Sequence, residues 1–303
     1  MLNFLKKHYL FCVGSILLIL LLFITFIGPY TPIVDRELET ITYVLDENRK
    51  PIIPPYPPSD EFLLGTDKTG RDLLSLLILG AKETLLMVVL ITVIRYLFAI
   101  PLSYFAHKKI LGTHHFLNWM NGLFSYIPTI IIVILIATLP PILFNDFRPH
   151  YLVMIIALVE VARAADMIKL EFDEISSKEY IKGGISSGSS SFTLFRTYYL
   201  PFLYGKILVY MISDLGRVMF LLGQLGFIGI YILQELIQLE SGMYKVINES
   251  ISWPMMLMEA FEDVRGPIWI PFYSALAMTY AIFTFNLFAQ GLQNFFKKKV
   301  QYI

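Results

Sequence analysis

The sequence predicts an all-α integral membrane protein with six transmembrane helices. Hydrophobic residues make up 56% of the 303 positions and charged residues only 16%, whereas a typical soluble domain carries about 25% charged residues. The charges are gathered in short blocks. The apolar runs between the blocks approach the roughly 20 residues that a helix needs to cross the hydrocarbon core of a bilayer.

The six apolar runs are long enough to be read individually as spans. They cover residues 9–27, 85–105, 117–139, 151–168, 202–225 and 269–288. The first run could be a signal peptide, but Gly28, Pro29 and Tyr30 follow it in place of a small-residue cleavage site, so we interpret it as a retained helix.

The segments between the spans divide the chain into four parts. An N-terminal transmembrane helix (1–28) precedes a polar, proline-rich extracytoplasmic segment (29–82), which should end in an interfacial helix over residues 72–80. A transmembrane domain follows (83–293) and contains a cytoplasmic loop (172–200). A short cytoplasmic tail (294–303) ends the chain. No internal repeat is visible, which disfavours secondary transporters built from inverted repeats.

Charge sorting predicts the orientation, because Lys and Arg concentrate on the cytoplasmic side of membrane proteins. With both termini in the cytoplasm, the inner segments hold Lys6, Lys7, Lys108, Lys109, Lys178, Lys182, Arg196 and Lys297–Lys299. The outer segments are acidic, with Asp35, Glu37, Glu39, Asp46, Glu47, Asp60, Glu61, Glu235, Glu240, Glu249, Glu259, Glu262 and Asp263. The net charge of zero gives no basic field for nucleic acid. The lone Cys12 excludes an internal disulfide or a cysteine zinc site.

The cytoplasmic loop has the pattern of a helix, a glycine turn and a second helix. Gly188 can adopt a positive φ and end the first helix, and the serines after it are good N-caps for the second. Pro201 suits the first turn of the following span. Such a hairpin could be gripped by a soluble partner, or it could be a solvated connector.

This loop resembles the coupling loop of ABC-importer permeases, whose pattern is Glu-Ala-Ala, three residues, Gly, and then Leu-Pro. The spacing is kept, but the identities differ, because a lysine and two glycines replace the acidic residue and the alanines, each glycine costing a helix about 1 kcal/mol. The positions assigned to this loop are Glu179, Lys182, Gly183, Gly184, Gly188, Leu200 and Pro201.

A second motif precedes the second span and resembles the "LGTD…GRD-LS" signature of the C-type permease in oligopeptide, dipeptide and nickel importers. Its residues are Gly65, Thr66, Asp67, Gly70, Arg71 and Asp72. The glycines permit tight turns, the aspartates can cap helix starts, and Arg71 can pair with either carboxylate. A structural role is favoured over contact with substrate. Weaker matches follow in family order to about residue 293.

The resemblance implies a type I ABC importer permease architecture with cytoplasmic coupling helices, in a bacterial plasma membrane. It implies a second homologous permease, two ABC ATPase subunits and an extracytoplasmic solute-binding protein as partners, besides membrane lipid. ATP and Mg would be bound by the ATPases, since this chain has no GxxxxGK[ST] loop. No catalytic residue, metal site or bound cofactor is expected in this chain. Peptides are the expected solute class, with nickel chelates, other metallophores or oligosaccharide-like solutes as alternatives.

Ionisable residues inside the spans are candidates for function. Glu160, Arg163, Asp166 and Lys169 alternate in sign at i,i+3 spacing and predict either a self-paired stripe or a polar wall along the pathway. Asp214 and Arg217 should pair with each other and face either the protein interior or a water-filled route, where they could line the substrate pathway. Arg95 has no evident partner. Asn121, near Pro128, suits a polar, kinked helix beside the pathway or a hydrogen bond between helices.

Three other classes of function remain open at this stage. A permease-derived scaffold or sensor would explain the altered coupling loop. A proton-coupled secondary transporter could use Glu160 or Asp214. An intramembrane enzyme is disfavoured, because no HExxH or Gly-x-Ser-x-Gly motif is present.

Overall fold

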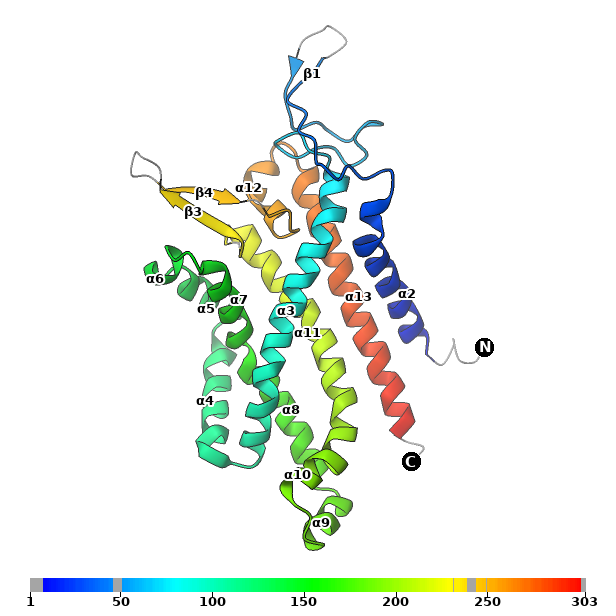
Figure 1. The fold of residues 1–303 in the computed structure, drawn as a ribbon, viewed down its shortest axis with the longest axis vertical. Coiled ribbons are helices and arrows are strands. Elements are labelled where there is room, and N and C mark those ends of the chain that lie inside the picture. The colour runs from blue at the N-terminus through cyan, green and yellow to red at the C-terminus, as the bar shows by residue number, and fades with distance from the viewer. Residues whose placement is uncertain (1–7, 46–50, 231, 239–243, 249, 301–303) are drawn as a thin grey trace.

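The computed structural model describes residues 8–45, 51–230, 232–238, 244–248 and 250–300. The described chain is an elongated bundle of helices with two small sheets at one end (Figure 1). In each sheet two antiparallel strands pair: β1 (Val44–Leu45) with β2 (Pro51–Ile52), and β3 (Gln234–Gln238) with β4 (Tyr244–Asn248). The all-α membrane class is confirmed. The charged positions Lys6, Lys7, Asp46, Glu47, Glu240 and Glu249 lie outside the described residues.

Four long helices form the body of the bundle: α2 (Tyr9–Phe26), α3 (Leu73–His107), α11 (Leu200–Ile228) and α13 (Trp269–Val300). Small residues let α2 and α13 pack closely, as is common between membrane helices. A Cβ on Gly14 would lie 2.7 Å from the Phe288 Cα, and a Cβ on Gly291 would lie 2.5 Å from the Phe11 Cα. The Tyr280 hydroxyl adds a 2.9 Å hydrogen bond to the Leu17 carbonyl.

Shorter helices complete the chain between these four. They are η1 (Gly28–Tyr30), η2 (Ile110–Gly112), α4 (Thr113–Tyr126), α5 (Thr129–Ala137), α6 (Pro140–Leu143), α7 (Arg148–Val159), α8 (Val161–Ser176), α9 (Glu179–Ser186), α10 (Ser191–Leu194), η3 (Phe195–Tyr199), η4 (Met255–Leu257) and α12 (Ala260–Asp263). The hairpin of α9 and α10 lies at the opposite end of the molecule from the sheets (Figure 1).

Four stretches of the described chain are long and apolar enough to cross a membrane: α2, α3, the continuous run Ser191–Ile228, and α13. A fifth is possible if the bent pair α4–α5 crosses as a broken span. The predicted fourth span is not among them, because α7 and α8 are interrupted at Glu160 and carry several charges. The count of six therefore stays a prediction.

Three local expectations need correction. The interfacial helix over residues 72–80 is not a separate element, because α3 starts at Leu73 and continues to His107, about 52 Å at 1.5 Å per residue. The third span is kinked near Pro128 as expected, but the kink is a sharp bend, with α4 and α5 meeting at 94°. The fourth span is two helices, with Glu160 between them at φ −96° and ψ 4°.

Candidate functional site

The motif before α3 forms a compact loop organised around one carboxylate. Asp67 accepts hydrogen bonds from the Thr69 and Arg71 backbone N–H groups, each at 2.9 Å. It also forms a 2.7 Å ion pair with the Arg71 guanidinium, which selects Asp67 over Asp72 as the partner of Arg71. Asp72 instead caps α3, where it accepts from the Ser75 N–H at 2.8 Å. One aspartate thus shapes the turn and the other starts the helix.

The same loop holds other segments at this end of the bundle together. Thr66 is fully buried, and its backbone carbonyl accepts from the Trp269 indole N–H at 3.0 Å, at the start of α13. Gly65 (φ +81°) lies against the Trp269 ring, and Gly70 (φ +85°) leaves room for the Ile41 carbonyl, which a Cβ would approach to 2.2 Å. These contacts support a structural role for the motif.

Lys68, which the sequence analysis did not select, fastens this loop to α12. Its ammonium group pairs with Glu259 and, at 2.7 Å, with the buried Asp263. Burial lowers the pKa of Lys68, but the hydrogen bonds and charges of Asp263 and Glu259 outweigh this effect and raise the pKa above its usual value.

At the other end of the molecule, α9 and α10 form the predicted helical hairpin. Gly188 ends α9 with φ +77°, and the Ser189 N–H closes the turn on the Gly184 carbonyl at 3.1 Å. Ser190 caps α10 by accepting from the Thr193 N–H at 3.2 Å. Pro201 lies in the first turn of α11, as expected. Glu179, Lys182 and Gly183 are exposed on α9, and Leu200 is 43% exposed.

Aromatic side chains anchor the hairpin to the bundle. Tyr180 of α9 stacks on Phe202 of α11, with ring centroids 5.7 Å apart, and on Tyr198 at 6.2 Å. Ile181 of α9 is completely buried. The hairpin is therefore fixed against the start of α11, and a displacement of α9 would act directly on that helix.

The two glycines of α9 occupy different environments. A Cβ on Gly183 would meet no atom within 4 Å, whereas a Cβ on Gly184 would lie 3.0 Å from Leu194 Cδ2 and 3.4 Å from the Tyr198 ring. Gly184 thus lets α9 pack closely on α10 and η3. This packing accounts for one of the two departures from the alanines of the resembled pattern.

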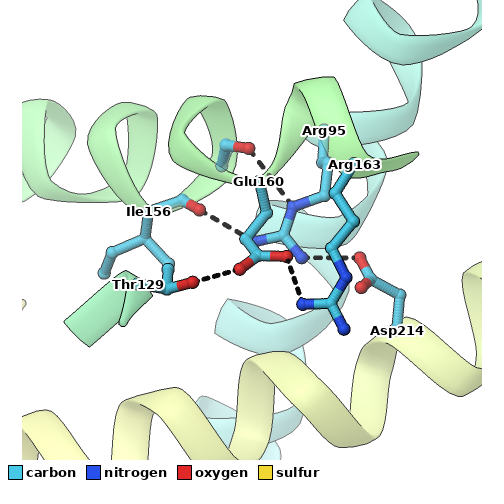
Figure 2. Close-up of polar contacts among 7 residues, drawn as sticks. Arg95, Thr129, Ile156, Glu160, Arg163 and Asp214 are labelled. Carbon is cyan, nitrogen blue, oxygen red and sulfur yellow. Dashed lines mark hydrogen bonds and ion pairs between the residues drawn. The ribbon is translucent and has the colours of Figure 1, made fainter. Parts of the chain in front are cut away.

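Within the membrane helices the expected pair of Asp214 and Arg217 does not form. Asp214 instead forms a 2.7 Å ion pair with Arg95, which comes from α3 (Figure 2). Both side chains are buried, Arg95 to 1% exposure and Asp214 to 3%. Helical spacing places Arg217 near Asp214, but Arg95 from α3 forms the ion pair with the Asp214 carboxylate.

Arg95 also stabilises the break between α7 and α8 by binding backbone carbonyl groups there. The last carbonyls of a helix lack N–H partners from the same helix, and inside a membrane they need substitutes. The Arg95 guanidinium donates to the Ile156 carbonyl at 2.8 Å and to the Ala157 carbonyl at 3.2 Å (Figure 2). Arg95 thus joins α3, α7 and α11 at one point.

Glu160 occupies the break itself and connects it to the bend between α4 and α5. Its carboxylate accepts a hydrogen bond from the Thr129 hydroxyl, at the start of α5, and forms a 3.1 Å ion pair with Arg163 (Figure 2). Lys169 pairs with Asp173 at 3.2 Å rather than with Asp166. The predicted self-paired stripe is thus only partly present.

The remaining predicted positions are Asn121 and Arg217. Asn121 is half-buried on α4, one turn before the bend. Arg217 is exposed on α11 and makes no ion pair with any residue that the structure describes. It lines a cavity of about 190 Å³ between α8, α11 and α13.

No family model matches the chain, but several curated proteins resemble it along most of its length. The dipeptide transport system permease protein DppC of Bacillus subtilis (strain 168) is 23% identical over 300 residues, which covers 98% of this chain and 84% of the relative. The di/tripeptide transport system permease protein DppC of Pseudomonas aeruginosa (strain UCBPP-PA14) is 24% identical over 270 residues, covering 83% and 82%. The probable D,D-dipeptide transport system permease protein DdpC of Escherichia coli (strain K12) is 22% identical over 298 residues, covering 97% and 89%.

These matches agree with the two motifs, with the helical hairpin and with the apolar helices. A scaffold, sensor or proton-coupled transporter is not favoured beside relatives that are all transport permeases. The chain is a multi-pass membrane protein of the bacterial inner membrane and a permease subunit of an ABC importer, and it is similar along most of its length to permeases of dipeptide transport systems.

Proposed function

We propose that this chain is one of two permease subunits in an ATP-driven importer of peptides or similar small solutes. The three relatives described above are named for dipeptide, di/tripeptide or D,D-dipeptide transport, which supports peptides as the solute class. The second permease completes the pathway, and an extracytoplasmic solute-binding protein delivers the solute. Two ATPase subunits bind and hydrolyse ATP with Mg, so this chain is not itself an enzyme.

The observation that carries this proposal is the α9–α10 hairpin. It projects from the end of the bundle opposite the outer loop (Figure 1), exposes Lys182 and Ile185, and is stacked through Tyr180 on the start of α11. A soluble ATPase that grips α9 can therefore move α11, which carries Asp214 and Arg217. This arrangement supports a coupling role despite the unusual residues.

The orientation follows from the same proposal. The hairpin must face the cytoplasm to reach the ATPases, and the first turn of α2 and the last turns of α13 point toward the same end (Figure 1). Both termini would then be cytoplasmic, and the Asp67 loop would face the solute-binding protein.

Solute uptake in cells that express the complete transport system tests the proposal. Uptake of labelled dialanine should stop when the ATPase subunits carry a hydrolysis-blocking substitution, and it should persist when a protonophore is added while ATP is maintained. Uptake that survives loss of the ATPase but collapses with the protonophore would contradict the proposal in favour of proton coupling.

A further inference from the structure

The packing of the helices does not explain the cavity beside Arg217. It measures about 190 Å³, and it opens to the surface where Arg217, Gln290 and Gln293 are exposed. Six of its nine lining residues have polar side chains and three are apolar. The polar lining residues are Tyr210, Ser213, Arg217, Asn286, Gln290 and Gln293.

The charge carried by the lining of this cavity is positive. Arg217 is the one charged residue among its described lining residues. Asp214, less than one turn earlier on α11, is engaged by Arg95. The Tyr210 hydroxyl is committed to Glu171, which also pairs with Lys206. An anion that entered the cavity would therefore meet a guanidinium that forms no ion pair with any described residue, and no carboxylate in the lining.

Side-chain amide groups also line this cavity. A Cβ on Gly216 would lie 3.3 Å from the Asn286 Nδ2, so the glycine lets the Asn286 side chain lie directly against α11. Gln290 and Gln293 follow on α13. Three side-chain amides can each donate and accept a hydrogen bond, which matches the needs of a peptide group next to its carboxylate.

Arg217 lies far from the start of α11, at a position where a charged side chain without a binding partner is energetically costly. It lies 17 residues into α11, about 25 Å along the helix, and an arginine at such a depth normally faces a protein partner or a water-filled route. A guanidinium binds a carboxylate through two parallel hydrogen bonds. We propose that this cavity is a binding station for the carboxylate of the transported solute, with Arg217 as its cationic ligand.

This inference rests on the proposed function, and the test separates the two. The complete importer, with all its subunits, is assayed for uptake of labelled dialanine and of dialanine amide, which lacks the carboxylate. The variants are Arg217→Gln, Arg217→Lys as the charge-conserving form, and Arg36→Gln as a control that removes a cation from the outer segment.

We expect Arg217→Gln to lower uptake of the free acid about tenfold, since one hydrogen bond to a charged group contributes at least that factor. Uptake of the amide should stay within twofold of wild type. Arg217→Lys should retain part of the preference for the acid, and Arg36→Gln should change neither solute's uptake. Co-purification of all subunits confirms that each variant assembles.

Unchanged uptake of the free acid by Arg217→Gln would overturn the inference. An equal loss for acid and amide would also overturn it, because Arg217 would then contact the second permease or a lipid headgroup and not the solute. If the wild-type importer takes up neither form, the proposed function itself fails, and this inference fails with it.

Discussion

At the residue scale, a few buried polar contacts between distant parts of the chain hold the membrane helices together. Arg95 and Asp214 lie 119 positions apart in the sequence, and each would be costly to bury alone. The sequence analysis singled out both residues but paired neither correctly, because spacing along one helix reports local neighbours only. The one signal available in the sequence was an arginine inside an apolar run with no charged partner in its own span.

The first prediction concerns this pair. Arg95→Leu and Asp214→Leu should each lower the free energy of unfolding by about 3–5 kcal/mol, because each leaves a buried charge without its partner. The double variant should cost less than the sum of the two. Thermal unfolding of the purified protein in one detergent measures all three. Strictly additive losses would mean that the ion pair contributes no coupling energy.

The glycines of α9 give a second residue-scale prediction. Gly183→Ala should stabilise α9 by about 0.5–1 kcal/mol, because alanine is the better helix former and its Cβ meets open space. Gly184→Ala is the matched control, since its Cβ would press on Leu194 and the Tyr198 ring. Hydrogen exchange of the α9 amides should slow in the first variant only. Equal slowing in both would show that Gly184 has no packing role.

At the element scale, local signals were reliable and long-range ones were not. The cap at Asp72, the turn at Gly188 and the cap at Ser190 follow from short-range backbone chemistry, and all three are present. Pro128 predicted a break in the helix. It did not predict the 94° bend between α4 and α5, which depends on how α5 packs against α7. The break at Glu160 has no glycine or proline signal, and it is stabilised by Arg95 from α3.

The start of α3 offers an element-scale test. Asp72→Ala should destabilise the first turn by about 1 kcal/mol, because the Ser75 N–H loses its acceptor. Asp72→Ser keeps an acceptor and should cost little. Hydrogen exchange at the amide of Ser75 reads the effect. If alanine and serine behave alike, the Asp72 carboxylate does not cap this helix.

At the scale of the whole molecule, we propose that the two ends of the bundle face opposite sides of the membrane, the Asp67 loop outside and the α9–α10 hairpin inside. The outer end is organised by Asp67 and Thr66, and the inner end by the α9–α10 hairpin and its aromatic anchor. Composition predicted the membrane class correctly. The number of membrane crossings was harder to predict from the sequence, because the charges between Glu160 and Lys169 lie in a segment that forms two helices, α7 and α8.

Thiol labelling tests this orientation directly. In a Cys12→Ser background, Glu61→Cys should react with a membrane-impermeant maleimide in intact cells, because that position is exposed on the outer segment. Ser187→Cys, exposed on the hairpin, should react only after the cells are opened. Labelling of position 187 in intact cells would reverse the proposed topology.

The proposed coupling role is tested most directly by identifying the proteins that contact the α9–α10 hairpin in the assembled complex. The tagged chain, carrying Ser187→Cys or Glu61→Cys in the Cys12→Ser background, is cross-linked in membranes and purified in mild detergent. The account predicts a second permease and two ATPase subunits in the complex, with position 187 cross-linked to an ATPase and position 61 not. A chain that purifies without any ATPase, or whose position 187 never reaches one, would contradict it.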